Sequence, residues 1–244
     1  MVNNQLNIYS IMEYQRELSA KDYKETVVIE NTLVRSVYIW MCTALLLTGG
    51  TATLVAGSPR LLEIVFGNSF LFWAILIAQF GLVWAISAKV TSFSLPTLSG
   101  LFMLYSVLTG LTFSVYFFAF TAESIASTFF ITAGTFAVMS IYGFVTKRDL
   151  TKIGNLAFMA LIGIVIASVV NIFLHSTTLN WIVTYIGVLV FVGLIAWDTQ
   201  KIKALALAED NEFTQKLAIC GALSLYLDFI NLFIMLLRIF GQRK

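Results

Sequence analysis

Residues 153–197 decide the fold, reading IGNLAFMALIGIVIASVVNIFLHSTTLNWIVTYIGVLVFVGLIAW without a formal charge. A helix crosses about 30 Å of hydrocarbon with about 20 apolar residues, so this stretch is too long for one crossing and long enough for two. Its only polar break is HSTTLN, at residues 175–180. The break predicts two membrane helices, over residues 154–174 and 179–200.

Five further apolar spans lie outside this stretch, at residues 36–57, 69–88, 96–120, 123–145 and 216–240. Pro96 falls in the first turn of its span, where a helix tolerates proline. The connecting segments are too short to form a soluble domain. The sequence therefore predicts an all-α integral membrane protein, with an N-terminal segment (1–35), a seven-helix transmembrane domain (36–240) and a short C-terminal tail (241–244).

Composition supports a membrane protein and excludes one other class. Hydrophobic residues make up 59% of the chain and charged residues 11%, against about 25% charged in soluble domains. The net charge is only +2, and no basic patch is interleaved with exposed aromatic residues, which excludes nucleic-acid binding. Residues 1–35 carry several charges and no apolar core, so we expect no signal peptide.

The distribution of Lys and Arg predicts the orientation. Eleven of these 15 residues fall on the side of the N-terminus, and four fall on the other side: Arg60, Arg238, Arg243 and Lys244. The positive-inside rule therefore predicts a cytoplasmic N-terminus. Because Arg238 lies near the end of the seventh span and Arg243 and Lys244 follow it, a basic C-terminus would lie outside after seven crossings, so a re-entrant or central last segment with its tail drawn inward is left open.

Small residues at four-residue spacing predict close contacts between helices. One such run lies in the third span, and a shorter pair lies in the fifth. They comprise Ser106, Gly110 and Ser114, and Gly163 and Ala167.

Two aspartates, Asp198 and Asp228, fall inside or at the edge of the apolar spans. A charged side chain in the middle of a membrane helix costs roughly 2.5 to 3.5 kcal/mol, so it usually faces a partner, a cavity or an ion path. Asp228 lies about 18 Å into its predicted helix. Asp198 lies near Lys201 and Lys203, so a salt-bridged residue at a helix end is the alternative interpretation for it.

Helical spacing places each aspartate on a face with small or polar neighbours. In the seventh span this face consists of Gly221, Ser224, Asp228 and Asn231. In the sixth span it consists of Thr184, Gly187, Phe191 and Asp198. We expect the face in the seventh span to look into the bundle, with Ser224 and Asn231 as polar residues along a pore.

Two carboxyl groups that meet in a low-dielectric interior cannot both be ionised without repulsion, so the pair takes up and releases protons as one unit. Such a pair is a pH sensor. A divalent cation competes for the same negative charge, but two carboxylates fall short of the six to eight oxygens that calcium prefers. We therefore expect Asp198 and Asp228 to bind calcium weakly and transiently, which suits permeation, and we expect no cofactor.

Three segments resemble the signatures of one family. Residues 196–202 read AWDTQKI, residues 223–233 read LSLYLDFINLF and run into LLRIFG at 236–241, and residues 146–150 read TKRDL. The first two resemble the signature segments of the Bax inhibitor-1 family, and the third looks like its bacterial branch. The resemblance covers the membrane part from the first span to the C-terminus.

The resemblance implies a bundle whose last helix runs between two three-helix layers and acts as a pH-sensitive calcium leak channel in a bacterial inner membrane. The family's aspartate pair corresponds by motif to Asp198 and Asp228. In bacterial members, arginines at the end of the second helix can lock onto the first aspartate. Here Lys89 is the only basic residue nearby, so it is the candidate latch.

Other functions fit the sequence less well than a channel. Intramembrane aspartyl proteases also pair two aspartates, but Asp228 lacks their Gly-x-Gly-Asp motif and no proline lies near it. His175 is the sole histidine, so no zinc or serine protease site can be assembled, and we expect no enzyme. The remaining alternative is a regulatory membrane protein, because relatives are thought to restrain a membrane-bound protease or modulate stress and cell-death machinery. Residues 3–31 would then be the contact surface.

Overall fold

A computed structural model describes residues 32–205 and 212–244. In this part of the chain, seven helices are long and apolar enough to cross a membrane, as predicted. They are Thr32–Ala56, α3 (Ser69–Ala88), α4 with α5 (Leu95–Phe113 and Tyr116–Ala119), α6 (Ala122–Val145), α7 (Thr151–Leu174), α8 (Thr177–Leu205) and α9 (Glu212–Phe240). Most of the predicted N-terminal segment, including the possible contact surface at 3–31, lies outside the described residues.

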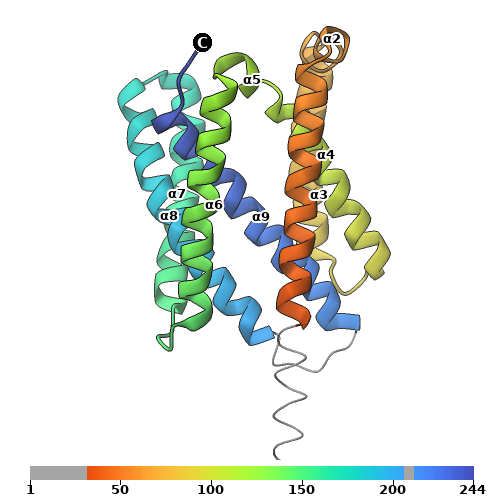
Figure 1. The fold of residues 1–244 in the computed structure, drawn as a ribbon, viewed down its shortest axis with the longest axis vertical. Helices are drawn as coiled ribbons and strands as arrows, with labels where there is room; N and C mark the ends of the chain where they lie inside the picture. Colours follow the sequence, from red (N-terminus) through yellow and green to blue (C-terminus); the bar gives the residue numbers. More distant parts are fainter. Residues whose placement is uncertain (1–31, 206–211) are drawn as a thin grey trace, which may run out of the picture.

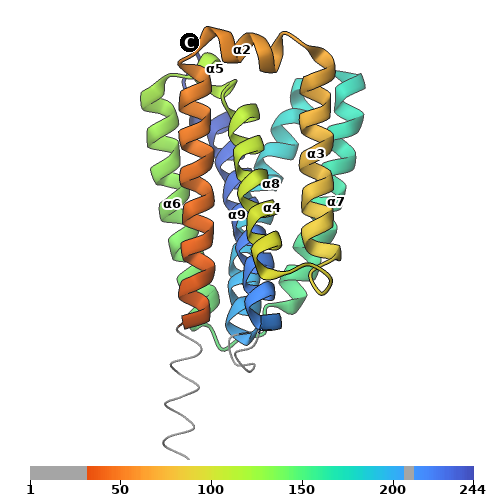
Figure 2. The ribbon, with the colours of Figure 1, turned by 90° about the vertical axis from the view of Figure 1, so that its right-hand side faces the viewer.

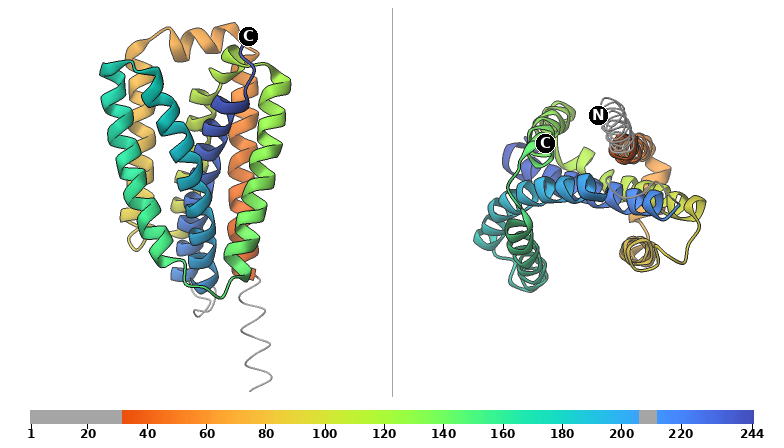
Figure 3. Two further views of the ribbon diagram at one scale, coloured as in Figure 1. Left: turned by 90° about the vertical axis from the view of Figure 1, so that its left-hand side faces the viewer. Right: turned by 90° about the horizontal axis from the view of Figure 1, so that it is seen from below.

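The last helix is central, as the resemblance implies. In Figure 1, α9 runs obliquely through the bundle. Helix Thr32–Ala56, α3 and α4 lie on one side of it, and α6, α7 and α8 lie on the other, as the end-on view in Figure 3 also shows. In α9, 72% of the residues in an apolar stretch of 18 are buried, whereas in α3 the share is 11%. The outer helices therefore offer apolar surface to lipid, whereas α9 is packed by protein on nearly every side.

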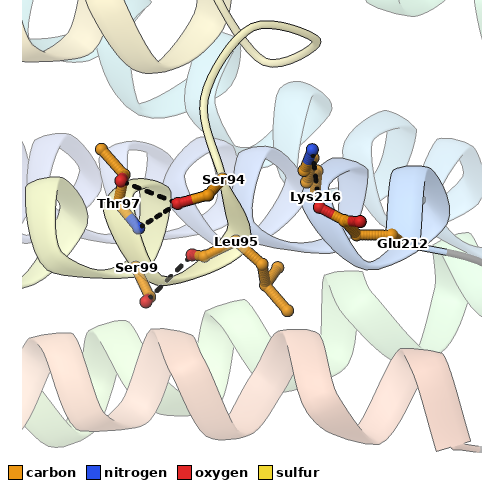
Figure 4. Close-up of polar contacts among 6 residues, drawn as sticks. All are labelled: Ser94, Leu95, Thr97, Ser99, Glu212 and Lys216. Atoms are coloured by element: carbon orange, nitrogen blue, oxygen red, sulfur yellow. Dashed lines mark hydrogen bonds and ion pairs between the residues drawn. The ribbon is translucent and has the colours of Figure 1, made fainter.

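Local sequence explains where two of the helices begin (Figure 4). The Ser94 hydroxyl accepts a hydrogen bond from the backbone N–H of Thr97 at 3.4 Å, and Pro96 occupies the first turn of α4. The Glu212 carboxylate pairs with Lys216 at 2.8 Å in the first turn of α9. An acidic residue is favourable in the first turns of a helix, and the described part of α9 already includes Glu212, four residues before Lys216, where the prediction placed the start.

Two elements differ from the sequence prediction. The short helix α2 (Pro59–Phe66) lies across the end of the bundle between Thr32–Ala56 and α3 (Figure 2) and was not predicted. The third span is not one continuous helix, because α4 ends at Phe113 and α5 begins at Tyr116. The Ser114 hydroxyl donates to the carbonyl of Leu111 at 2.7 Å, a local bond that competes with helix continuation.

The two ends of α9 lie at opposite ends of the bundle. Its start lies near the start of Thr32–Ala56, and the C-terminus lies near α2 and α5 (Figure 2). A re-entrant last segment is therefore wrong. The TKRDL loop and the end of α8 share the end where Thr32–Ala56 begins (Figure 1). The basic residues thus gather at one end as predicted, and the assignment of that end to the cytoplasm stays a prediction.

The small residues of the third span make the predicted close contact. A Cβ atom on Gly110 would lie 2.6 Å from Thr51 Cβ and 2.7 Å from the Thr48 carbonyl oxygen. The Tyr226 hydroxyl of α9 lies 2.6 Å from Thr48 Oγ1 and ties the central helix to the same junction. The prediction was wrong for Gly163, around which nothing lies within 4 Å of a built Cβ.

Candidate functional site

Two glycines hold α6 and α7 close to α8 immediately before Asp198. A Cβ on Gly143 of α6 would lie within 2.9 Å of the carbonyl carbon of Ala196 and closer still to its oxygen. A Cβ on Gly154 of α7 would overlap the indole of Trp197. Both approaches need a residue without a side chain. The first residues of the AWDTQKI segment therefore fix the position of α8 against its neighbours.

Asp198 is buried, with 7% of its surface exposed, and its Oδ1 forms an ion pair with Lys201 Nζ at 2.6 Å. The same ammonium group lies 3.8 Å from the ring centroid of Trp197, a cation–π geometry. Asp198 is the 22nd of the 29 residues of α8, about two turns before its end. The salt bridge of the alternative interpretation is present, but Asp198 is buried inside the helix and does not lie at its end.

The remaining residues of the segment fasten the end of α8. Gln200 Oε1 accepts from the backbone N–H of Leu150 at 2.9 Å, and Gln200 Nε2 donates to the Arg148 carbonyl at 2.9 Å. Lys203 donates to the Phe144 carbonyl at 2.9 Å. Gln200 thus satisfies backbone groups of the TKRDL loop, so the loop and the AWDTQKI segment form one structural unit.

Asp228 is the 17th of the 29 residues of α9 and is 5% exposed. Its Oδ2 atom is fully buried and has no hydrogen-bond partner among residues 32–205 and 212–244. Asp228 interacts electrostatically with Asp198, and Lys201 interacts with both carboxyl groups. The structure therefore brings the two predicted aspartates into one electrostatic group, with Lys201 as its third member.

A cavity with a volume of about 170 Å³ opens between the end of α8 and α9. Asp198, Lys201 and Ser224 line it, but Asp228 does not. Because Ser224 and Asp228 are one helical turn apart, Asp228 lies just beyond the inner end of this cavity. One carboxyl of the group thus contacts a cavity, while the other is enclosed by protein.

Beyond Asp228 the contact between α8 and α9 is filled by apolar groups. A Cβ on Gly187 would lie 3.2 Å from both Sδ and Cε of Met235, so this glycine makes room for the methionine. Phe191, one turn nearer to Asp198, is 4% exposed. The predicted face of α8, comprising Thr184, Gly187, Phe191 and Asp198, is buried throughout.

The predicted polar face of α9 is less buried than its apolar side. Gly221, Ser224 and Asn231 are intermediate in exposure, whereas Leu223, Leu225 and Tyr226 are fully or almost fully buried. Asn231 donates to the Leu227 carbonyl of its own helix at 2.8 Å. Gly221 and Ser224 face α8, where they line a cavity with Asp198, and Asp228 is buried, so this part of the face looks into the bundle as expected.

The structure pairs Asp198 with Lys201, not with Lys89. Lys89 ends α3, is exposed, and forms no ion pair with any other residue in the described ranges. The family's latch comes from the second helix, but here the cation comes from one turn further along the same helix as the aspartate. A role for Lys89 stays a prediction.

A row of buried hydroxyl groups on α6 was not predicted from the sequence. Ser124, Thr128, Thr132 and Ser140 recur at multiples of four residues and all are buried. Thr128 Oγ1 and Ser140 Oγ have no hydrogen-bond partner. The four-residue spacing of Ser and Thr was the signal that would have identified this row, since such residues share one face of a helix.

The donor set around the aspartates does not resemble a stable metal site. Among residues 32–205 and 212–244, no group of three or more His, Cys, Asp or Glu side chains could hold a metal ion. Calcium prefers six to eight oxygen ligands, and this site offers two carboxyl groups. The residues are thus compatible with brief contact with a cation rather than with storage.

The fold and this site define a class of protein: a seven-helix membrane protein whose central helix carries a buried aspartate beside a second aspartate paired with lysine. The family model described as "Inhibitor of apoptosis-promoting Bax1" matches residues 30–244. The chain belongs to the Bax inhibitor-1 family, as the sequence motifs indicated.

Its relatives include bacterial membrane proteins. The inner membrane protein YbhL of Escherichia coli K12 is 54% identical over 216 residues, covering 87% of this chain and 92% of YbhL. An uncharacterized protein of Borreliella burgdorferi is 44% identical, covering 91% of this chain and 96% of its own. An uncharacterized membrane protein of Streptococcus pyogenes M1 is 38% identical, covering 75% and 80%. The seven spanning helices and the similarity to YbhL support a multi-pass inner membrane protein.

Proposed function

We propose that the protein is a pH-sensitive calcium leak channel in which Asp198 and Asp228 share a proton and control passage between α8 and α9. The observation that carries this proposal is the buried, unpartnered Oδ2 of Asp228, next to the ion pair of Asp198 and Lys201. A charge is costly at such a place unless it is compensated. A proton or a cation supplies that compensation.

Charge accounting links pH to cation binding. With one proton on the two carboxyl groups, the remaining negative charge balances Lys201. Loss of that proton leaves one uncompensated negative charge at the inner end of the cavity, and a cation is then attracted to it. We therefore expect the occupancy of the pair by calcium to rise as the pH rises, with the apolar contact between Gly187 and Met235 as the barrier beyond the pair.

A flux assay tests this function. The purified full-length chain is reconstituted into liposomes loaded with a calcium-sensitive dye, and calcium entry is measured over a series of pH values against protein-free liposomes. We expect calcium entry that depends on pH. The absence of flux above the protein-free control at every pH would contradict the channel and favour the regulatory alternative. That alternative predicts that a membrane protease co-purifies with the full chain but not with a chain lacking residues 3–31.

Lys201→Gln is expected to change the pH response of calcium flux more than any other single lysine substitution at this end of the bundle. It removes the cation that pairs with Asp198 at 2.6 Å, the one ion-pair partner of either carboxyl group among the described residues. Lys203→Gln is the matched control, because its ammonium bonds the Phe144 carbonyl instead. Lys89→Gln tests the latch suggested by the family. A shift in pH response with Lys89→Gln but not with Lys201→Gln would contradict the assignment.

We propose in addition that the N-terminus is cytoplasmic, because the end of the bundle near the start of Thr32–Ala56 carries most of the basic residues. A C-terminal alkaline phosphatase fusion, which is active only outside the cytoplasm, should then be active. A C-terminal green fluorescent protein fusion should be dark when exported through the general secretory route. The reverse pair of results would show that the orientation is inverted.

A further inference from the structure

A second cavity lies at the opposite end of the contact between α8 and α9. It has a volume of about 620 Å³ and is lined by Thr177, Asn180 and Thr184 of α8 and by Arg238, Gly241 and Arg243 of α9 and the tail. Thr184 is 2% exposed. The lining thus combines two guanidinium groups with hydroxyl and amide groups, and it contains no acidic residue.

The position of Arg243 is built by the fold. The tail pairs with the segment between α5 and α6, through a bond from the Thr121 N–H to the Gln242 carbonyl at 3.0 Å and one from the Lys244 N–H to the Ala119 carbonyl at 3.2 Å. The Gln242 N–H donates to Ser124 Oγ at 2.8 Å. Figure 3 shows the tail beside the start of α6. Because side chains alternate along an extended segment, the tail presents Arg243 on the side opposite Gln242 and Lys244.

Neither arginine that lines this cavity has an anionic partner in the described part of the chain. The ion pairs among the described residues are Lys201 with Asp198 and Lys216 with Glu212, and neither guanidinium group donates a hydrogen bond within the described part of the chain. Lys244, by contrast, donates to the Phe117 carbonyl at 2.7 Å. Two unpaired guanidinium groups that line one cavity match the oxygens of a phosphate group, to which arginine can donate two parallel hydrogen bonds.

Trp181 indicates the depth of the cavity in the membrane. It lines the same cavity, is 46% exposed and stacks on Tyr185 with ring centroids 5.7 Å apart. Exposed Trp and Tyr near the ends of membrane helices occupy the level of the lipid headgroups. The cavity is thus placed where phospholipid phosphates are concentrated.

We propose that this cavity is an anion-binding site for a phosphate group, held by Arg238 and Arg243 and bordered by Thr177, Asn180 and Thr184. Two sources share this chemistry: the headgroup of an anionic phospholipid and soluble inorganic phosphate. The site is distinct from the aspartate pair. Its occupancy is measured by binding, so it stands or fails independently of calcium flux.

The lipid source is tested with the purified full chain in detergent, mixed with equal amounts of phosphatidylglycerol and zwitterionic phosphatidylcholine, by native mass spectrometry of the retained lipid. Wild type should retain phosphatidylglycerol preferentially, and the double variant R238Q/R243Q should bind it about tenfold more weakly or worse. Arg60→Gln is the matched control, because it removes one arginine from α2 at the same end of the bundle without touching the cavity. It should leave binding unchanged.

The phosphate source is tested by titrating sodium phosphate against sodium chloride at equal ionic strength and following the thermal unfolding midpoint. Stabilisation of wild type but not of R238Q/R243Q assigns the site to soluble phosphate, and retention of lipid alone assigns it to the phospholipid. The variant R238K/R243K keeps the charge but loses the bidentate geometry, and should bind with intermediate strength if the fold is intact. Equal binding of both compounds by wild type and R238Q/R243Q, or no binding of either by wild type, overturns the proposal.

Discussion

Gly143→Ala is expected to destabilise the protein by about 3 kcal/mol, at the upper end of the usual cost of overpacking. The added Cβ would lie within 2.9 Å of the Ala196 carbonyl carbon, and its closest obstacle is the backbone carbonyl oxygen rather than a movable side chain. The helices α6 and α8 must therefore separate. For a chain of this size the thermal unfolding midpoint should fall by roughly 6 to 12 °C.

The matched control for this substitution lies on the same helix. Around Gly134 of α6 nothing lies within 4 Å of a built Cβ. Gly134→Ala should therefore be neutral or stabilising by up to about 1 kcal/mol, from helix propensity alone. Both variants are compared with wild type by thermal unfolding in the same detergent. Equal midpoints for Gly143→Ala and Gly134→Ala would show that the close approach of α6 and α8 does not contribute to stability.

Asp228→Asn is expected to abolish the pH dependence of calcium flux under the proposed function. Asparagine keeps the size and planarity of the side chain but cannot exchange a proton, so Asp198 loses the group with which it interacts. Calcium entry into dye-loaded liposomes should then be the same at every pH at which the vesicles remain sealed. The protein should still fold, since the substitution places no new charge at this buried position.

Asp149→Asn is the control for this experiment. Asp149 is an exposed carboxylate in the loop before α7, where its Oδ1 accepts hydrogen bonds from the backbone N–H and the hydroxyl of Thr151. These bonds hold the pKa of the Asp149 carboxyl below its usual range. Its removal should leave the pH profile of flux unchanged. If the Asp228→Asn protein retained the wild-type pH profile of flux, the pH response would not depend on the aspartate pair.

The architecture could be predicted from the sequence because charges and capping residues mark where the helices end. The second span matches α3 residue for residue, with Asn68 capping its start and Lys89 following its end. The α2 helix was missed because, at eight residues, it is far too short for the span criterion. The earlier start of α9 was missed because the ion pair of Glu212 with Lys216 allows charged residues inside the first turn.

The candidate site could be predicted only in part. The motifs and helical spacing identified Asp198 and Asp228, and the structure places them in one electrostatic group. The alternative of a salt bridge near Lys201 and Lys203 gave the ion-pair partner of Asp198, because a lysine three residues later on the same helix is within reach by helical geometry alone. The latch role of Lys89 stays a prediction. The contacts of Gly143 with Ala196 and of Gly154 with Trp197 required the fold itself, because nothing in a single sequence pairs residues on different helices.

The central claim is that Asp198 and Asp228 hold one proton between them. The most direct test is infrared spectroscopy of the carboxylic acid C=O stretch as the pH is varied, in wild type, Asp198→Asn and Asp228→Asn. The account predicts a protonated carboxyl band in wild type that is lost in Asp228→Asn, and whose pH of disappearance shifts in Asp198→Asn because the neighbouring charge is gone. A band that titrates identically in wild type and Asp198→Asn would contradict the shared proton.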